Sequence, residues 1–436
     1  MKTKRIMLTA VLTLIGAGTA VAIPADPAPK KVRQADGTEK TVYLQGDEFW
    51  HQMFTNDGKA VVWNPQTNML EPDKRTRADY EQAMLRRQAA QQRWQRPVGH
   101  ATPAGPRHIR INNFPTTGKS KSLVVLLEFS DTRFSSIDDP KDYYHRMLNQ
   151  RGFTWSNGAI GSAMDFYDQS SNYQFDHEFV VLGPITLDHE ATYYGSDTPK
   201  QDARAGEMVV EACQKIDDDV DFSEYDYDGD GCVDNIYFFY AGIGQATHPG
   251  ATDYIWPHSG DLDDDWQLWP EFDGKRIRHY ATSNELRYTG DDTLVPLGIG
   301  VFVHEFGHVL GLADHYDVAY GMLTFNVKNW DTMANGSHNN EMNCPPLFSA
   351  FERAELGWLD YEMLNSEVDS VCTLPPLSQL LPSQRPANSQ QPTASSPRHT
   401  AGACQAPRAA SSLSWRTASR WASTSRCPVT AWWCGT

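Results

Sequence analysis

Apolar positions change their spacing along the chain, and each spacing predicts a different element. Two short apolar runs bounded by polar residues, 122–129 and 235–241, have the length and composition of buried strands. Elsewhere apolar residues return every three or four positions, as in helices that bury one face, near 143–148, 162–167 and 199–215. Strands interspersed with helices predict an α+β fold with α/β-like character.

The first hundred residues have a different pattern. Residues 40–65 alternate apolar and polar positions around turn signals such as Asn56-Asp57-Gly58, which predicts a small hairpin-rich unit. Residues 74–96 are rich in Arg, Gln, Ala and Glu and predict a polar helix. The basic segment after it contains Pro and Gly and suits proteolytic cleavage, with an ordinary interdomain tether as the alternative. We therefore expect an N-terminal unit at 23–96, a linker at 97–118 and a main domain at 119–372.

The chain begins with the pattern of a secretory signal peptide at 1–22. Lys2, Lys4 and Arg5 precede an apolar run over 6–17, and small residues end the segment at Ala22. A membrane anchor is the alternative, but the run is shorter than the roughly 20 residues that span a bilayer. We expect a secreted protein, extracellular or in the cell envelope, with no stable membrane anchor.

The net charge and the cysteine content indicate which kinds of binding partner and which disulfides are expected. The 436 residues are 40% hydrophobic, which indicates a folded body, and the formal net charge is −17. This charge disfavours nucleic acid and attracts hard cations. All seven cysteines follow residue 200, and an exported chain permits disulfides. The first four cysteines are Cys213, Cys232, Cys344 and Cys372. They could form two disulfide bridges in three ways, and free buried thiols are the alternative.

The sequence His304-Glu305-Phe-Gly-His308 carries the most specific chemistry. Positions four apart lie about 40° apart around a helix, so both imidazoles can face one point and bind one zinc ion. Glu305 can reach a metal-bound water and act as the general base. The alternative is that His304 and His308 are core histidines on an amphipathic helix.

A third metal ligand is expected just beyond this helix. Gly311 can adopt the left-handed conformation that ends a helix and turns the chain, which would bring Asp314 back to the metal. The neighbouring His315 is another candidate. A later segment could supply the ligand instead, from Glu341, Glu352 or Glu355.

The segment Trp330-Asp-Thr-Met333 places a methionine after the zinc signature, and this arrangement resembles the metzincins, whose methionine underlies the metal. Most metzincins have His where this chain has Asp314. That departure, with Gly311-Leu-Ala-Asp314 and Tyr316-Asp317, resembles the immune inhibitor A group of bacterial metallopeptidases, the M6 family. Weaker matches at 46–49, 162–167 and 356–358 extend the resemblance over roughly residues 40–360.

The resemblance implies a metzincin-type catalytic domain, with a twisted mixed sheet and an active-site helix, preceded by a small pro-domain. It implies a secreted zinc endopeptidase that acts on proteins or peptides and is made as a precursor. Its own pro-domain would be the inhibitor, and the lack of cysteine before Cys213 excludes masking of the zinc by a leader thiolate. Two alternatives remain: a calcium-stabilised secreted binding protein without activity, and a metallohydrolase acting on a non-peptide amide.

A second cation site is expected in an acidic turn. Carboxylates at alternate positions around Gly231 suit calcium, a reading that the resemblance favours. The twelfth position of this loop is Tyr237 rather than the bidentate Glu of an EF-hand, and a solvated acidic turn is the alternative. The expected calcium ligands are Asp226, Asp228, Asp230 and Asp234.

The C-terminal segment, 373–436, differs from the rest of the chain. Beyond Asp369 it contains no Asp or Glu, yet it concentrates tryptophans and three cysteines. We interpret it as an aberrant tail produced by a change of reading frame near residues 373–385. A disordered low-complexity tail is the alternative.

Overall fold

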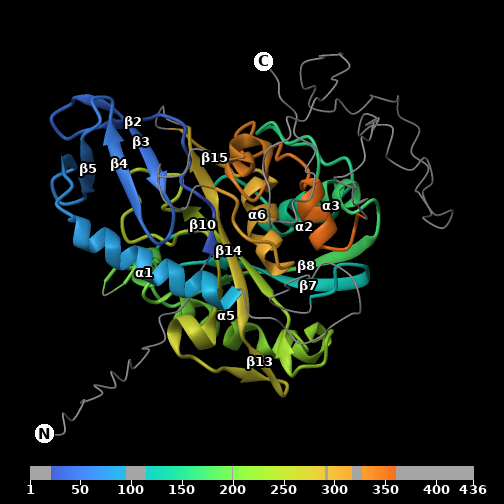
Figure 1. The fold of residues 1–436 in the computed structure, drawn as a ribbon. Coiled ribbons are helices and arrows are strands. Elements are labelled where there is room, and N and C mark those ends of the chain that lie inside the picture. Colours follow the sequence, from blue (N-terminus) through green and yellow to red (C-terminus); the bar gives the residue numbers. More distant parts are fainter. Residues whose placement is uncertain (1–20, 95–113, 199, 290–292, 317–326, 360–436) are drawn as a thin grey trace, which may run out of the picture.

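The computed structural model describes residues 21–94, 114–198, 200–289, 293–316 and 327–359 (Figure 1). They form a mixed helix and sheet structure, as the α+β prediction required. No helix among these residues combines the length and the apolar character needed to cross a membrane. Cys372 and the tail lie outside the described residues.

A seven-stranded mixed sheet forms the centre of the main domain. Strands β8, β7, β10 and β14 run parallel, and β11, β1 and β15 are antiparallel to their neighbours. The predicted strands at 122–129 and 235–241 are β7 and β10, in the middle of the sheet. In spatial order the strands are β1 (Val21–Ala22), β11 (His258–Asp261), β14 (His279–Tyr288), β10 (Ile236–Ile243), β7 (Gly118–Glu128) and β8 (Phe175–Thr186), with β15 (Leu294–Pro296) also paired to β14.

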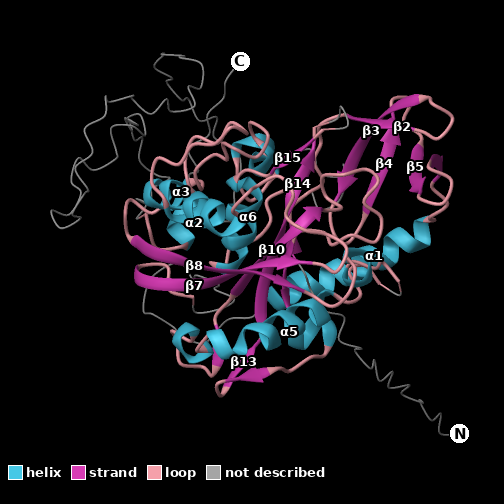
Figure 2. Ribbon diagram, turned by 180° about the vertical axis from the view of Figure 1, so that it is seen from behind, coloured by secondary structure: helices cyan, strands magenta, loops and turns pink. Residues whose placement is uncertain are grey.

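Helices cover both faces of this sheet (Figures 1 and 2). Successive strand residues point to opposite faces, so Val124 and Leu126 pack in one core and Leu123 and Val125 in the other. The first core contains α2 (Pro140–Asn149), α3 (Ala163–Ser170) and α6 (Ile299–Val309). The second contains α4 (Ala191–Tyr194) and α5 (Ala205–Ile216).

The expected hairpin-rich unit is a separate five-stranded antiparallel sheet, and the polar helix follows it. We call β2 to α1 the leader unit. Its elements are β2 (Lys30–Arg33), β3 (Glu39–Gly46), β4 (His51–Thr55), β5 (Ala60–Asn64), β6 (Met69–Pro72) and α1 (Arg77–Trp94). The end of the predicted linker already packs with the main domain, because Phe114 is buried and Trp358 Nε1 donates to the Thr116 carbonyl.

Short elements complete the main domain. They are β9 (Cys232–Val233), β12 (Glu271–Phe272), β13 (Lys275–Ile277), α7 (Ala350–Glu355), a π-turn (Leu262–Trp266) and 3₁₀ turns at 217–219, 222–225, 328–330 and 335–338.

The cysteines differ from the two bridges considered for the first four. Cys213 and Cys232 are free thiols, and Cys344 is disulfide-bonded. Cys213 lies inside the core on α5, where it packs as a small apolar side chain.

Candidate metal and catalytic site

The two histidines of the signature project from a fully buried helix. Every residue of α6 is buried, including His304, Glu305 and His308, and its apolar side chains pack against the central sheet. His304 and His308 lie one turn apart, and their Nε2 atoms are 3.3 Å from each other. The helical spacing predicted from the sequence therefore brings the two imidazoles to one point.

Hydrogen bonds to main-chain carbonyls orient both rings. His304 Nδ1 is 2.8 Å from the Thr332 carbonyl, and His308 Nδ1 is 2.8 Å from the Leu312 carbonyl. Because a carbonyl only accepts, the Nδ1 atom of each ring donates these bonds, and the Nε2 atoms face each other on the opposite side of the rings. Such bonds orient histidine ligands in metal sites.

Asp314 supplies the third group at this point. Its Oδ1 lies 3.3 Å from His304 Nε2 and 3.4 Å from His308 Nε2, and receives no hydrogen bond within the described part of the chain. Zinc bonds of 2.0–2.1 Å place tetrahedral ligands about 3.3 Å apart, so the spacing fits zinc. It exceeds the roughly 2.7–2.9 Å of a charge-assisted hydrogen bond.

Gly311 turns the chain toward Asp314 as expected. Its φ is +99°, and it follows the last residues of α6. The Gly311 N–H bonds the His308 carbonyl and the Leu312 N–H bonds the Gly307 carbonyl, which is the Schellman pattern of a helix end. Any side chain at 311 would be strained in this conformation.

Met333 lies against the same helix. It is fully buried, and a Cβ at Gly307 would lie only 2.5 Å from its sulfur. Its N–H donates to Asp331 Oδ1, and its carbonyl accepts from the His315 N–H, both at 2.7 Å. The methionine turn is therefore bound to the segment that carries Asp314.

His304, His308 and Asp314 could hold a metal ion, and we call them the metal-ligand group. Glu305 lies beside this group without joining it. Burial, and then the charge of Asp314, raises its pKa well above the usual value. Its Oε1 accepts the Ile23 N–H at 2.7 Å, and Oε2 has no hydrogen-bond partner among the described residues. A carboxyl in this setting can exchange a proton with a substrate or a water molecule.

The other candidates for the third ligand lie elsewhere. His315 and Glu352 meet Asp331 in a separate group, with His315 Nδ1 2.9 Å from Asp331 and 3.6 Å from Glu352. Although burial lowers the pKa of His315, its bond to Asp331 and the charge of Glu352 raise it to about 9. Glu341 is exposed and pairs with Arg287, and Glu355 ends α7. The sequence did not predict a role for Asp331.

The acidic turn brings three of its four expected ligands together. Carboxylate oxygens of Asp226, Asp228 and Asp230 lie within 4.8 Å of one another. Asp226 also pairs with Lys275 at 2.7 Å. Asp234 is outside this group, and its Oδ2 accepts the Tyr227 N–H instead. Calcium at this turn stays a prediction.

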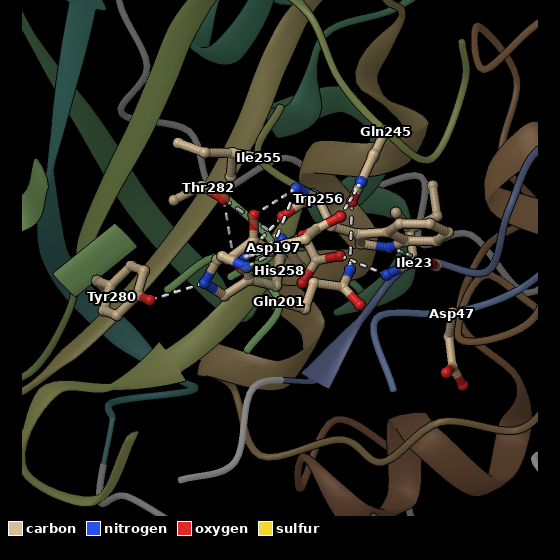
Figure 3. Close-up of polar contacts among 12 residues, drawn as sticks. Ile23, Asp47, Asp197, Gln201, Gln245, Ile255, Trp256, His258, Tyr280 and Thr282 are labelled. Atoms are coloured by element: carbon tan, nitrogen blue, oxygen red, sulfur yellow. Dashed lines mark hydrogen bonds and ion pairs between the residues drawn. The ribbon is translucent and has the colours of Figure 1, made fainter. Parts of the chain in front are cut away.

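An extended segment just before the leader unit, Ile23 to Asp26, crosses the site. Trp256 Nε1 donates to the Ile23 carbonyl at 3.0 Å, and His338 Nε2 is 2.8 Å from the Pro24 carbonyl (Figure 3 shows the first pair). The Asp26 N–H donates to the Ala246 carbonyl. These partners are hundreds of residues apart, so no local pattern predicts a role for Ile23, Trp256 or His338.

The leader unit also contacts the chain beyond Asp314. Arg87 of α1 is buried, forms an ion pair with Asp47, and is 3.3 Å from the Tyr316 hydroxyl. Glu48 is buried, and its carboxylate oxygens lack hydrogen-bond partners among the described residues. Burial, followed by the charge of Asp47, raises its pKa, and Asp314 contributes in the same direction. The leader unit therefore places carboxylates near the metal-ligand group.

A large part of the chain is similar to known proteins. Residues 112–359 match the family described as "Immune inhibitor A peptidase M6, catalytic domain". The chain is 26% identical over 328 residues to "Pre-pro-metalloprotease PrtV" of Vibrio cholerae serotype O1 (strain M66-2), covering 65% of this chain and 35% of that protein. It is 27% identical over 304 residues to "Immune inhibitor A" of Bacillus thuringiensis subsp. alesti, covering 57% and 43%. The chain thus spans less than half the length of these curated relatives.

Proposed function

The chain belongs to the M6 peptidase family, and from this premise we propose that it is a secreted zinc-dependent endopeptidase that hydrolyses peptide bonds in proteins. His304, His308 and Asp314 would hold the zinc ion, and Glu305 would act as general base. The predicted signal peptide supports secretion. The relatives named as metalloproteases support the reaction class.

One observation carries the assignment of the metal site. His304 Nε2, His308 Nε2 and Asp314 Oδ1 lie 3.3–3.4 Å from one another in a buried site, and the Nδ1 atom of each ring is bonded to a main-chain carbonyl. Three acceptors facing one another repel unless a cation lies between them. Nitrogen and oxygen donors in this number and spacing suit zinc.

The ligands and Glu305 would have different roles in hydrolysis. A bound zinc ion would supply the Lewis acidity that polarises the scissile carbonyl and acidifies water. Glu305 takes a proton from the attacking water and delivers it to the leaving nitrogen. Its position supports both transfers, because Oε1 already contacts a main-chain N–H and Oε2 is free of hydrogen bonds within the described chain. Burial favours the protonated carboxyl that the second transfer needs.

Replacing the base while leaving the ligands intact tests the proposal. We expect Glu305→Gln to bind zinc in a one-to-one ratio and to lose casein hydrolysis by about 10²- to 10⁴-fold. Glu341→Gln is the matched control, since Glu341 is exposed and does not belong to the ligand group. It should keep full activity, and a chelator should abolish the activity of both the control and the unsubstituted protein. Full activity of Glu305→Gln would contradict the assigned role.

The leader unit and the segment before it are proposed as the inhibitor of the precursor. The Ile23–Asp26 segment occupies the approach to Glu305, and Arg87 holds the leader unit against Tyr316. A protein substrate cannot reach Glu305 while this segment is in place. Activation would therefore require that the leader unit be displaced or cleaved.

A further inference from the structure

Asp331 lies between the two chain segments that carry the metal-ligand group. Its Oδ2 is 2.9 Å from Nδ1 of His315, the residue that directly follows Asp314. The residue after Asp331 is Thr332, whose carbonyl orients the His304 ring from 2.8 Å away. One buried side chain therefore links the segment of the third ligand to the peptide that holds the first ligand.

Three hydrogen bonds close a ring around the Asp331 side chain. The His315 N–H donates to the Met333 carbonyl, and the Met333 N–H donates to Asp331 Oδ1, both at 2.7 Å. The bond between His315 Nδ1 and Asp331 Oδ2 completes the ring. The Asp331 carbonyl also accepts the N–H groups of Ala334 and Gly336. Because both carboxylate oxygens are used, the side chain cannot rotate without breaking a bond at one end.

Glu352 supports this ring from helix α7. It is fully buried, and its Oε2 accepts the Ser349 N–H. Its Oε1 lies 3.6 Å from His315 Nδ1 and has no hydrogen-bond partner among the described residues. His315, Asp331 and Glu352 are close enough to hold a cation of their own. However, the 2.9 Å between Nδ1 and Oδ2 is a hydrogen-bond distance, shorter than the roughly 3.3 Å between two ligands of one zinc ion.

We propose that Asp331 is a positioning residue for the zinc ion, because it sets the separation between His304 and Asp314. It acts on the first ligand through Thr332 and on the third through His315. This role rests on the proposed zinc site but not on the peptidase reaction. Metal ligands bind well when outer hydrogen bonds fix their positions before the ion arrives. Without Asp331, the 3.3 Å between His304 Nε2 and Asp314 Oδ1 would no longer be held from both sides.

The zinc affinity of the full chain tests this role without a measurement of activity. Competition with a chelator of known affinity should give Asp331→Ala a zinc dissociation constant about 10- to 100-fold higher than that of the unsubstituted chain. Asp168→Ala is the matched control, because Asp168 is also buried and pairs with Arg151 at 2.6 Å but lies outside the metal-ligand group. It should lower the free energy of unfolding and leave the zinc dissociation constant unchanged.

Substitutions of His315 provide a milder test if Asp331→Ala does not fold. His315→Ala removes one bond of the ring at a partly exposed position and should raise the zinc dissociation constant about tenfold. His315→Asn places an amide N–H near the position of Nδ1 and should restore the constant to within about threefold of the unsubstituted value. If His315 only stabilised the fold, both variants would lose stability and keep their zinc affinity.

Three results would contradict the inference in different ways. Unchanged zinc affinity in Asp331→Ala and His315→Ala would overturn the positioning role and leave the zinc site in place. Failure of the unsubstituted chain to bind zinc would refute the proposed zinc site itself. Two zinc ions per unsubstituted chain, with one of them lost in Asp331→Ala, would show that His315, Asp331 and Glu352 hold a cation of their own, which would also overturn the positioning role.

Discussion

The contact between Gly307 and Met333 allows a quantitative test of how the methionine turn supports the metal helix. A Cβ built at Gly307 lies 2.5 Å from Met333 Sδ, 3.2 Å from its Cε and 3.4 Å from Phe348 Cζ. Ordinary contacts require about 3.5–4.0 Å, so the sulfur must move by roughly 1 Å. The Met333 main chain cannot follow, because both its N–H and its carbonyl are hydrogen-bonded.

Two opposing terms set the effect of Gly307→Ala on the free energy of unfolding. Alanine in a helix interior is favoured over glycine by about 1 kcal/mol, while overpacking a core costs about 1–3 kcal/mol. We therefore expect a net loss of about 1 kcal/mol. In a Met333→Ala background, which itself costs about 2–5 kcal/mol, the new methyl group enters vacant space. There Gly307→Ala should stabilise the protein by about 1 kcal/mol, which gives a coupling energy of about 2 kcal/mol.

Urea unfolding of the unsubstituted protein, the two single variants and the double variant measures this coupling. Tryptophan fluorescence can follow the transition, and zinc should be present throughout so that all four proteins hold the same metal. Residues in contact show interaction energies above about 0.5 kcal/mol, whereas independent sites add. Additive effects within that limit would show that Met333 does not pack on Gly307, and our account of the methionine turn would be wrong.

Two further predictions concern acid stability and latency. His177 is buried between aromatic rings, and burial lowers its pKa to about 3. Below pH 6.5 this histidine takes up a proton in the unfolded state but not in the folded state. The free energy of unfolding should therefore fall by about 2 kcal/mol between pH 7 and pH 5. His177→Asn keeps a partner for Ser120 Oγ and should flatten this part of the stability curve in thermal unfolding; an unchanged slope would contradict the assignment. Arg87→Ala removes the buried ion pair with Asp47 and weakens the attachment of the leader unit, so the precursor should hydrolyse casein faster than the unsubstituted precursor. Arg77→Ala, at an exposed position of the same helix, should not, and equal rates for the two variants would argue against inhibition by the leader unit.

The elements that the sequence predicted are those whose pattern is purely local. Local patterns predicted the strands β7 and β10 from their apolar runs and the helices α2, α3 and α5 from their three- to four-residue spacing. These patterns are strong because both faces of the central sheet are buried. The strand β14 had no such signal, since it carries Ser283, Asn284 and Glu285 in its interior. Glu285 is tolerated there because the N–H groups of residues 135, 136 and 242 bond its oxygens. Such long-range compensation cannot be read from spacing.

The same division holds at the site. The metal-ligand group spans only eleven residues, from His304 to Asp314, so helix geometry and one glycine were enough to predict that its side chains meet. The contacts of Ile23 with Glu305 and Trp256 join segments more than 230 residues apart. They depend on how β1 adds to the edge of the central sheet, which no local pattern predicts.

In the proposed peptidase, an extended substrate would take the place of β1 beside β11. A polypeptide that replaces β1 must offer unpaired N–H and C=O groups along an extended stretch, and these groups are already bonded inside helices and sheets. A folded target must therefore open locally before it is cut. A segment of the substrate protein whose local unfolding costs about 4 kcal/mol would be cleaved roughly a thousandfold more slowly than an exposed loop. The local stability of the substrate protein, as much as its sequence, would therefore decide where cleavage occurs.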